Sequence, residues 1–212
     1  MNNVVLLGDS IFDNEIWASN GEPVIEHLRK HLPKKWKATL LAIDGSTTEA
    51  IDIQLEKLPS DASLLFLSFG GNNALQNMGM LFEPAKSTTD VLENFADMVE
   101  DFQIKYRYML KKVLRLNLPT VICTIYFPRF PDPRWQKSVL SALTFYNDCI
   151  IREAVTARLP ILDLRFVCTE ASDFTNAIEP SAIGGQKIAQ AIARLIQNHD
   201  FIRLSQNTCV YT

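Results

Sequence analysis

Several features are missing from this 212-residue sequence, and each absence argues against a class of protein. No apolar run reaches the roughly 18 residues that a membrane helix needs. The N-terminus lacks a basic segment followed by an apolar core and a small-residue cleavage site, so we expect no secretory signal and a cytoplasmic location. The 21 basic and 24 acidic residues give a net charge of -3 without a concentrated basic face, which argues against nucleic acid as a partner.

Cysteine and histidine are also scarce. The four cysteines are widely spaced and lie mostly in apolar stretches, so we expect reduced thiols rather than a disulfide framework or a zinc site. His27 and His31 are four residues apart on an expected helix, but no third ligand is near them in the sequence. Neither a Gly-x-Gly-x-x-Gly turn nor a phosphate-binding Gly-x-x-x-x-Gly-Lys-Ser/Thr loop follows an expected strand, which argues against a nucleotide or a flavin. We expect no metal and no cofactor.

The composition is that of an ordinary globular protein, with 47% hydrophobic and 21% charged residues. Short apolar runs alternate with helical patterns, which predicts βαβ crossovers and a parallel sheet in one α/β domain over residues 1–200, followed by a tail over 201–212. We expect five strands, at 4–7, 37–43, 63–69, 120–126 and 160–164. We expect helices at 22–31, about 48–58, 89–116, 136–159 and about 181–198, with loops at 74–87, 127–133 and 169–176.

Polar turns follow the first three strands. Ser10 comes directly after the first apolar run, Gly45 after the second and Asn72 after the third, while Glu179 precedes the last helix. The carboxyl ends of parallel strands meet at one edge of a sheet, where ligands bind in open α/β folds. We therefore expect these four residues to share one pocket.

The turns resemble sequence blocks of the SGNH, or GDSL, hydrolases. Gly8-Asp9-Ser10 resembles the first block, Gly45 matches the glycine of the second, and Gly70-Gly71-Asn72-Asn73 resembles the third. The resemblance spans the chain and implies a three-layer α/β/α, flavodoxin-like fold. It also implies an esterase or lipase-like enzyme that acts on a small acyl or acetyl ester.

The fourth block departs from the family pattern. The family usually has Asp-x-x-His before a proline and the last helix, whereas this chain has Asn176-Ala177-Ile178-Glu179-Pro180. Glu179 therefore stands at the position of the histidine and Asn176 at that of the aspartate. We expect Asn176, together with Asp9 and Asn73, to contact substrate, although Asp9 is equally suited to capping its turn.

The resemblance assigns roles to the four main residues. Ser10 is the expected nucleophile, and the oxyanion donors are the backbone N–H groups of Ser10 and Gly45 and the side-chain amide of Asn72. Glu179 is the expected base. Free glutamate, with a pKa of roughly 4.3, is a weaker base than histidine. It can act if burial raises its pKa or if an acid such as Asp173 shares its proton.

Two functions fit these residues. The first is ester hydrolysis by Ser10, and the second is a noncatalytic relative that keeps the pocket to bind an acyl or acetylated molecule or a partner. The retained serine and oxyanion donors favour the enzyme, whereas the loss of both the histidine and the aspartate of the family pattern favours the binding protein. His27, His31 and His199 lie on helix bodies or after the last helix, where we do not expect them to reach Ser10. The sequence leaves the oligomeric state open.

Overall fold

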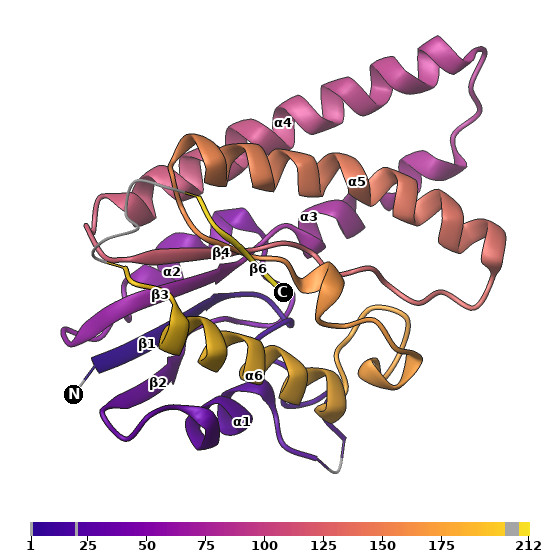
Figure 1. Cartoon of the computed structure of the whole chain (residues 1–212). Coiled ribbons are helices and arrows are strands. Elements are labelled where there is room, and N and C mark those ends of the chain that lie inside the picture. The colour runs from indigo at the N-terminus through magenta and orange to yellow at the C-terminus, as the bar shows by residue number, and fades with distance from the viewer. Residues whose placement is uncertain (1, 20, 202–207) are drawn as a thin grey trace.

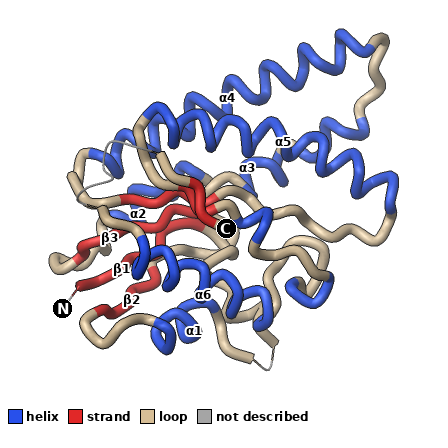
Figure 2. The backbone as a smooth tube through the Cα atoms, viewed as in Figure 1, coloured by secondary structure: helices blue, strands red, loops and turns tan. Residues whose placement is uncertain are grey.

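The computed structural model describes residues 2–19, 21–201 and 208–212. It forms a parallel sheet with the strand order β2-β1-β3-β4-β5-β6, and helices cover both faces (Figures 1 and 2). The strands are β1 (Asn2–Gly8), β2 (Trp36–Leu40), β3 (Ala62–Ser68), β4 (Thr120–Cys123), β5 (Ile161–Leu162) and β6 (Val210–Tyr211). The expected α/β class and parallel sheet are confirmed.

The helices form two layers, one on each side of the sheet. One side carries α1 (Val24–His31) and α6 (Ala182–Asn198), and the other carries α2 (Ile51–Leu55), α4 (Thr88–Leu114) and α5 (Pro133–Thr156) (Figure 1). The short α3 (Gly71–Gln76) follows β3 directly. The N-terminal ends of α4 and α5 extend beyond the sheet, on the side where the loops after the strands gather. No helix in the described residues is long and apolar enough to span a bilayer.

The alternation of side chains along the strands produces two cores. Val4 and Leu6 of β1 are wholly buried against the α1 and α6 layer, while Val5 and Leu7 are wholly buried against the α4 and α5 layer. Successive side chains of a strand point to opposite faces, so a strand covered on both sides must be apolar at every position. The uninterrupted apolar run in β1 is thus explained by helices on both faces.

The strand order reverses next to β1, the strand that leads to Ser10. β1 pairs with β2 on one side and with β3 on the other, both in parallel. Connections from these strands leave in opposite directions, which opens a crevice at their carboxyl ends, the usual ligand site of a doubly wound sheet. The Ser10 turn begins at this crevice.

Four sequence expectations need correction. The described residues contain six strands rather than five, because 210–211 of the expected tail pair with β5 in parallel; residues 202–207 of that tail lie outside the described residues. The stretch 74–87, expected as a loop, contains the end of α3 and the 3-10 helix η2 (Met78–Phe82). Both are too short to give a helical repeat.

The two other corrections concern the boundaries of the fourth strand and of the helix after it. The strand expected at 120–126 ends at Cys123. The helix expected from residue 136 starts at Pro133, because Asp132 caps it and accepts hydrogen bonds from the N–H groups of Arg134 and Trp135 at 2.8 Å.

Candidate active site

Close packing of two strands fixes the start of the Ser10 turn. Gly8 ends β1 with φ of +147°, and a Cβ atom added to it would lie 2.2 Å from the carbonyl oxygen of Ser68. Only glycine fits this position without moving β3. The next residue, Asp9, donates its backbone N–H to the same carbonyl at 3.2 Å. The last residues of β3 therefore anchor the chain that leads to Ser10.

A buried glutamine also holds this strand end. The Gln54 side chain of α2 is wholly buried, accepts a hydrogen bond from the Gly8 N–H at 2.9 Å and donates to the Gly8 carbonyl at 2.7 Å. One amide thus satisfies both backbone groups of the residue that ends the strand, and leaving either unpaired in the core would cost free energy. Gln54 was not among the expected site residues, because a lone polar residue in a short helix carries no sequence signal.

The second and third turns meet through Asn72. Its Nδ2 donates to the carbonyl oxygen of Ser46 at 3.0 Å, which ties the start of α3 to the loop that follows β2. Gly45 in that loop is exposed, has φ of +76°, and a Cβ atom there would meet nothing within 4 Å. The backbone conformation, rather than crowding, therefore favours glycine. A primary amide has two N–H groups, so Asn72 keeps one donor beyond the bond to Ser46.

Glu179 is delivered by a loop that folds back on itself. Asn176 is exposed, and its Oδ1 accepts hydrogen bonds from the backbone N–H groups of Ile178 and Glu179, both at 2.9 Å. The Thr175 N–H donates to the Glu179 carbonyl at 2.9 Å, and the Tyr126 hydroxyl donates to the Ile178 carbonyl at 2.6 Å. These bonds hold the backbone of Ile178 and Glu179 in place, and with it the start of the Glu179 side chain.

The surroundings of Glu179 favour its neutral form. Burial raises the pKa of this carboxyl above its ordinary value, hydrogen bonding with the Ser10 side chain lowers it, and the nearby charge of Asp44 raises it, with a net upward shift. Its Oε2 atom is buried and has no hydrogen-bond partner among the described residues. The environment therefore makes Glu179 a stronger base than free glutamate and leaves one oxygen without a partner.

Asp9 is the second carboxyl group in this site. Burial raises its pKa to about 8, a backbone hydrogen bond from Ile11 at 3.2 Å opposes this, and the charge of Glu179 adds to the rise. At neutral pH, Asp9 is therefore mostly a neutral carboxylic acid beside Glu179. Two neighbouring carboxyl groups with different burial hold their protons unequally, which is a recurring feature of catalytic sites.

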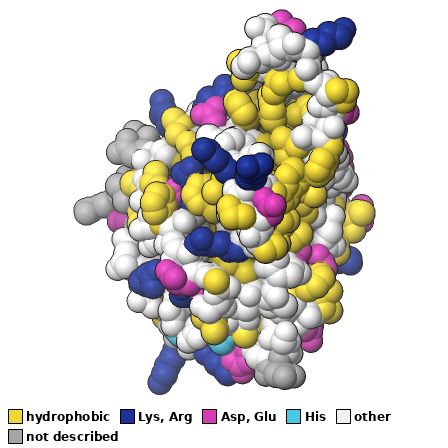
Figure 3. Space-filling view, turned by 90° about the vertical axis from the view of Figure 1, so that its right-hand side faces the viewer, with side chains coloured by type: hydrophobic (Ala, Val, Ile, Leu, Met, Phe, Trp, Pro, Cys, Tyr) yellow, Lys and Arg dark blue, Asp and Glu magenta, His cyan; other side chains and the backbone are white. Residues whose placement is uncertain are grey.

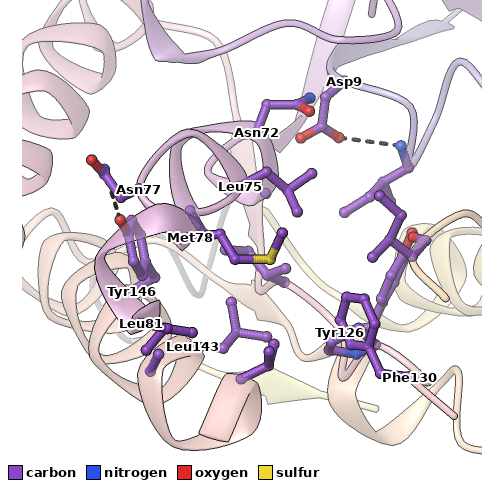
Figure 4. A pocket seen from close by; sticks show the side chains of 18 of the residues that line it. Asp9, Asn72, Leu75, Asn77, Met78, Leu81, Tyr126, Phe130, Leu143 and Tyr146 are labelled. Atoms are coloured by element: carbon purple, nitrogen blue, oxygen red, sulfur yellow. Dashed lines mark hydrogen bonds between the residues drawn. The ribbon is translucent and has the colours of Figure 1, made fainter. Parts of the chain in front are cut away.

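Ser10, Asn72 and Glu179 line one pocket, and Asp9 lies in the same wall. The pocket holds about 790 Å³ of empty space, part of it open to solvent. Figure 4 shows Asp9 and Asn72 on one side, with Leu75 and Met78 projecting between them and Leu81. Three of the four residues expected to share one pocket therefore line it together, and the fourth, Gly45, does not.

Three expected site residues lie outside the lining of the pocket. Gly45 does not line the pocket, although the next residue, Ser46, accepts a hydrogen bond from Asn72. Asn73 is buried, accepting a hydrogen bond from the Thr48 N–H at 3.1 Å. Asn176 is bound to the backbone of its own loop. The bonds of Asn73 and Asn176 favour positioning of the site rather than contact with substrate.

Asp173 does not share a proton with Glu179. Its buried carboxylate pairs with Lys187 at 2.7 Å, and its Oδ2 accepts hydrogen bonds from the N–H groups of Thr169 and Glu170, both at 2.9 Å. The cation and the two backbone donors occupy this carboxyl group and tie the loop to α6. The carboxyl groups that interact with Glu179 are Asp9 and Asp44 instead.

The histidines play no part in the pocket. None of them is among its lining residues. His31 hydrogen-bonds the His27 carbonyl at 2.7 Å on α1, and His199 hydrogen-bonds the Tyr211 hydroxyl at 2.5 Å beside β6. Among the residues that line the pocket, Glu179 rather than a histidine is therefore the candidate base for Ser10.

Comparison with known sequences and folds identifies the origin of this arrangement. The sequence profile of the GDSL-like lipase/acylhydrolase family matches residues 6–187. The chain belongs to this family. Its GDSL character accounts for the Gly8-Asp9-Ser10 turn and confirms the resemblance and the expected enzyme class, a carboxylic ester hydrolase. A search among curated protein sequences found no significant match.

Solved structures with the same fold are GDSL-type esterases and lipases. The lipase Lip_vut3 from a goat rumen metagenome is 17% identical, with a TM-score of 0.69, and the match covers 96% of this chain and 100% of that one. The extracellular lipase of Streptomyces rimosus is 14% identical, with a TM-score of 0.66 and coverage of 94% and 100%. The aryl esterase of M. smegmatis is 13% identical, with a TM-score of 0.64 and coverage of 93% and 99%. At such identities the likeness establishes the GDSL fold alone.

Proposed function

We propose that this GDSL protein hydrolyses carboxylic esters with Ser10 as the nucleophile and Glu179 as the base. The observation that supports this most is that Ser10 and the buried Glu179, which are far apart in the sequence, line one pocket. The raised pKa of Glu179 fits a group that must accept a proton.

Each step follows from these groups. The Ser10 hydroxyl proton passes to the Glu179 carboxylate while Oγ bonds to the ester carbonyl carbon. The resulting oxyanion is held by the backbone N–H groups of Ser10 and Gly45 and by the free N–H of Asn72. The carbon–alkoxide bond then breaks, and the leaving alcohol takes the proton from Glu179. Water repeats the sequence on the acyl-serine, which releases the acid and restores Ser10.

A noncatalytic binding protein is the second candidate. It is favoured by the glutamate at the histidine position and by the use of one Asn72 N–H in the bond to the Ser46 carbonyl. A binding protein would need the pocket but no activated serine. The two candidates differ in whether turnover depends on Ser10.

The deciding experiment compares hydrolysis of p-nitrophenyl butyrate by the parent protein and by Ser10→Ala between pH 4 and pH 9. We expect slow hydrolysis by the parent and a loss on the order of 10³-fold or more in Ser10→Ala. Ser138→Ala, the same change at an exposed position of α5, is the control and should keep the parent rate. Equal rates in the parent and Ser10→Ala would leave the binding protein as the function.

A further inference from the structure

The pocket continues from Ser10 into an apolar chamber that ester cleavage alone does not require. Its walls come from α3 and η2 on one side and from α4 and α5 on the other. The side chains that line it are almost all apolar and include Leu75, Met78, Leu81, Met98, Val139 and Leu143. An acetyl group would leave nearly all of this surface without a partner.

Few polar side chains line the pocket, and the Tyr126 hydroxyl is already bonded to the Ile178 carbonyl at 2.6 Å. Asp9, Asn72 and Glu179 lie at the Ser10 end. Asn77 and Tyr146 lie on the opposite side from Asp9 (Figure 4), and the Asn77 side chain donates to the Tyr146 hydroxyl at 3.0 Å. Between these ends, few hydrogen-bonding groups are available to a sugar, whose hydroxyl groups would lose their bonds to water without replacement.

The charges in the pocket also restrict its ligand. Among the described residues, no lysine or arginine lines the pocket, and the acidic side chains that line it are Asp9 and Glu179. A phosphate or carboxylate on the substrate would therefore find no cation to pair with it. The pocket therefore suits an uncharged ester.

The apolar lining is adaptable and continues to the surface. Met78, Met80 and Met98 line the pocket, and these are three of the five methionines in the chain. Methionine side chains are flexible and pack against apolar groups of varied shape. At the end of η2, Phe82 is 73% exposed and its ring stacks on Trp135 with centroids 4.8 Å apart. Figure 3 shows hydrophobic side chains gathered on this face of the molecule, around the protruding ends of α4 and α5.

We propose that the chamber binds an unbranched aliphatic arm of a neutral ester, which would make this a medium-chain acyl or alkyl esterase rather than an acetyl esterase. The proposal rests on the proposed ester hydrolysis and adds the substrate class to it. Its physical basis is the continuity of the apolar chamber with Ser10, since an ester carbonyl at the serine would direct one arm into it.

The first test is a chain-length series. We expect kcat/KM of the parent for p-nitrophenyl esters to rise at least 10-fold from acetate to octanoate, since each fully buried methylene contributes about four-fold. Octyl acetate and methyl octanoate, each compared with ethyl acetate, then show whether the alcohol or the acyl side enters the chamber. A flat or falling series with both kinds of ester would overturn the proposal while leaving ester hydrolysis intact.

The second test fills the chamber. Ala142 lines it from α5 and is half-buried, so Ala142→Phe adds a ring there without disturbing a packed core. We expect the rate with octanoate to fall about 10-fold and the rate with acetate to stay within two-fold. Ser141→Phe adds the same ring to an exposed neighbour and should change neither. Equal losses on both esters in Ala142→Phe would contradict the proposal.

A binding measurement separates this proposal from the proposed function. In Ser10→Ala, calorimetry should detect binding of methyl octanoate, with much weaker binding of methyl acetate and loss of binding in Ser10→Ala/Ala142→Phe. Such binding by a protein whose parent cleaves no ester would overturn the proposed hydrolysis alone. Absence of binding would overturn the chamber proposal. A dimer in light scattering that Ala142→Phe dissociates, without ester binding, would identify a second copy as the occupant and equally overturn it.

Discussion

The Ser10 turn and the Glu179 loop face one pocket, but they are held in different ways. The Ser10 turn grows out of a central strand and is fixed by Gln54 and by the close contact between Gly8 and Ser68. The Glu179 loop lies outside the sheet and depends on the side chain of Asn176 and on its own backbone bonds. The proposed nucleophile is thus anchored in the sheet, whereas the proposed base is held by contacts within one loop.

Glu179→Gln tests the loop half most severely. We expect kcat/KM for a preferred ester to fall about 10² to 10⁴-fold, the usual contribution of a general base. Because only the carboxylate accepts a proton, parent activity should rise with pH through the Glu179 pKa, which burial places above 4.5. Glu179→His should restore part of the rate and move this rise toward neutral pH. Full activity in Glu179→Gln would show that the loop supplies no base.

Asn72→Ala tests the donor between the two regions. Loss of one oxyanion donor lowers kcat by about 10² to 10³-fold, and we expect KM to change little. Asn73→Ala is the contrasting variant, because Asn73 bonds Thr48 and does not line the pocket. It should lower the free energy of unfolding by about 1 to 3 kcal/mol and leave kcat within a few-fold under folding conditions. Equal kcat losses in both variants would contradict a specific role for Asn72.

Asp9→Asn tests the electrostatics of the sheet-anchored half. The Asp9 pKa is raised from 3.8 to about 8, so the folded protein holds a proton that the unfolded chain releases between these values. Its contribution to stability is therefore complete below pH 4 and is lost as pH rises through 8. We expect Asp9→Asn to raise the Tm at pH 8 and change it little at pH 4, with about 1.4 kcal/mol for each unit of pKa shift. Asp97→Asn, the same change on the exposed face of α4, should leave the Tm unchanged at both pH values.

Asn176→Ala gives the smallest expected effect. It removes the acceptor for two backbone N–H groups of the Glu179 loop, which should lower stability by about 0.5 to 1.5 kcal/mol. The rate should fall only a few-fold, with a shift in the pH profile, because Glu179 is then less well placed. Asn176→Asp keeps the acceptor oxygen, so its stability and its rate should be close to those of the parent. An unchanged pH profile in Asn176→Ala would separate this loop bond from the base.

The sequence indicated which turns meet at the pocket but not the segment that forms one of its walls. Ser10, Asn72 and Glu179, which line the pocket, each lie beside a strand end or a helix start, where parallel topology brings residues together. The α3 and η2 segment was expected as a loop, although it supplies Leu75 and Met78 to the pocket. Its helices contain only one or two turns, so no periodic pattern could mark them. The cytoplasmic location stays a prediction.

By itself, the sequence determined the α/β class, the family and the polar turns after the first three strands, because local apolar patterns and turn residues encode these directly. Only the tertiary structure decided the partners of the acidic groups. Asp173 pairs with Lys187, and Asp9 rather than Asp173 lies beside Glu179. The physical reason is that burial and the charge on neighbouring groups, which set the pKa of a carboxyl group, come from residues distant in the chain.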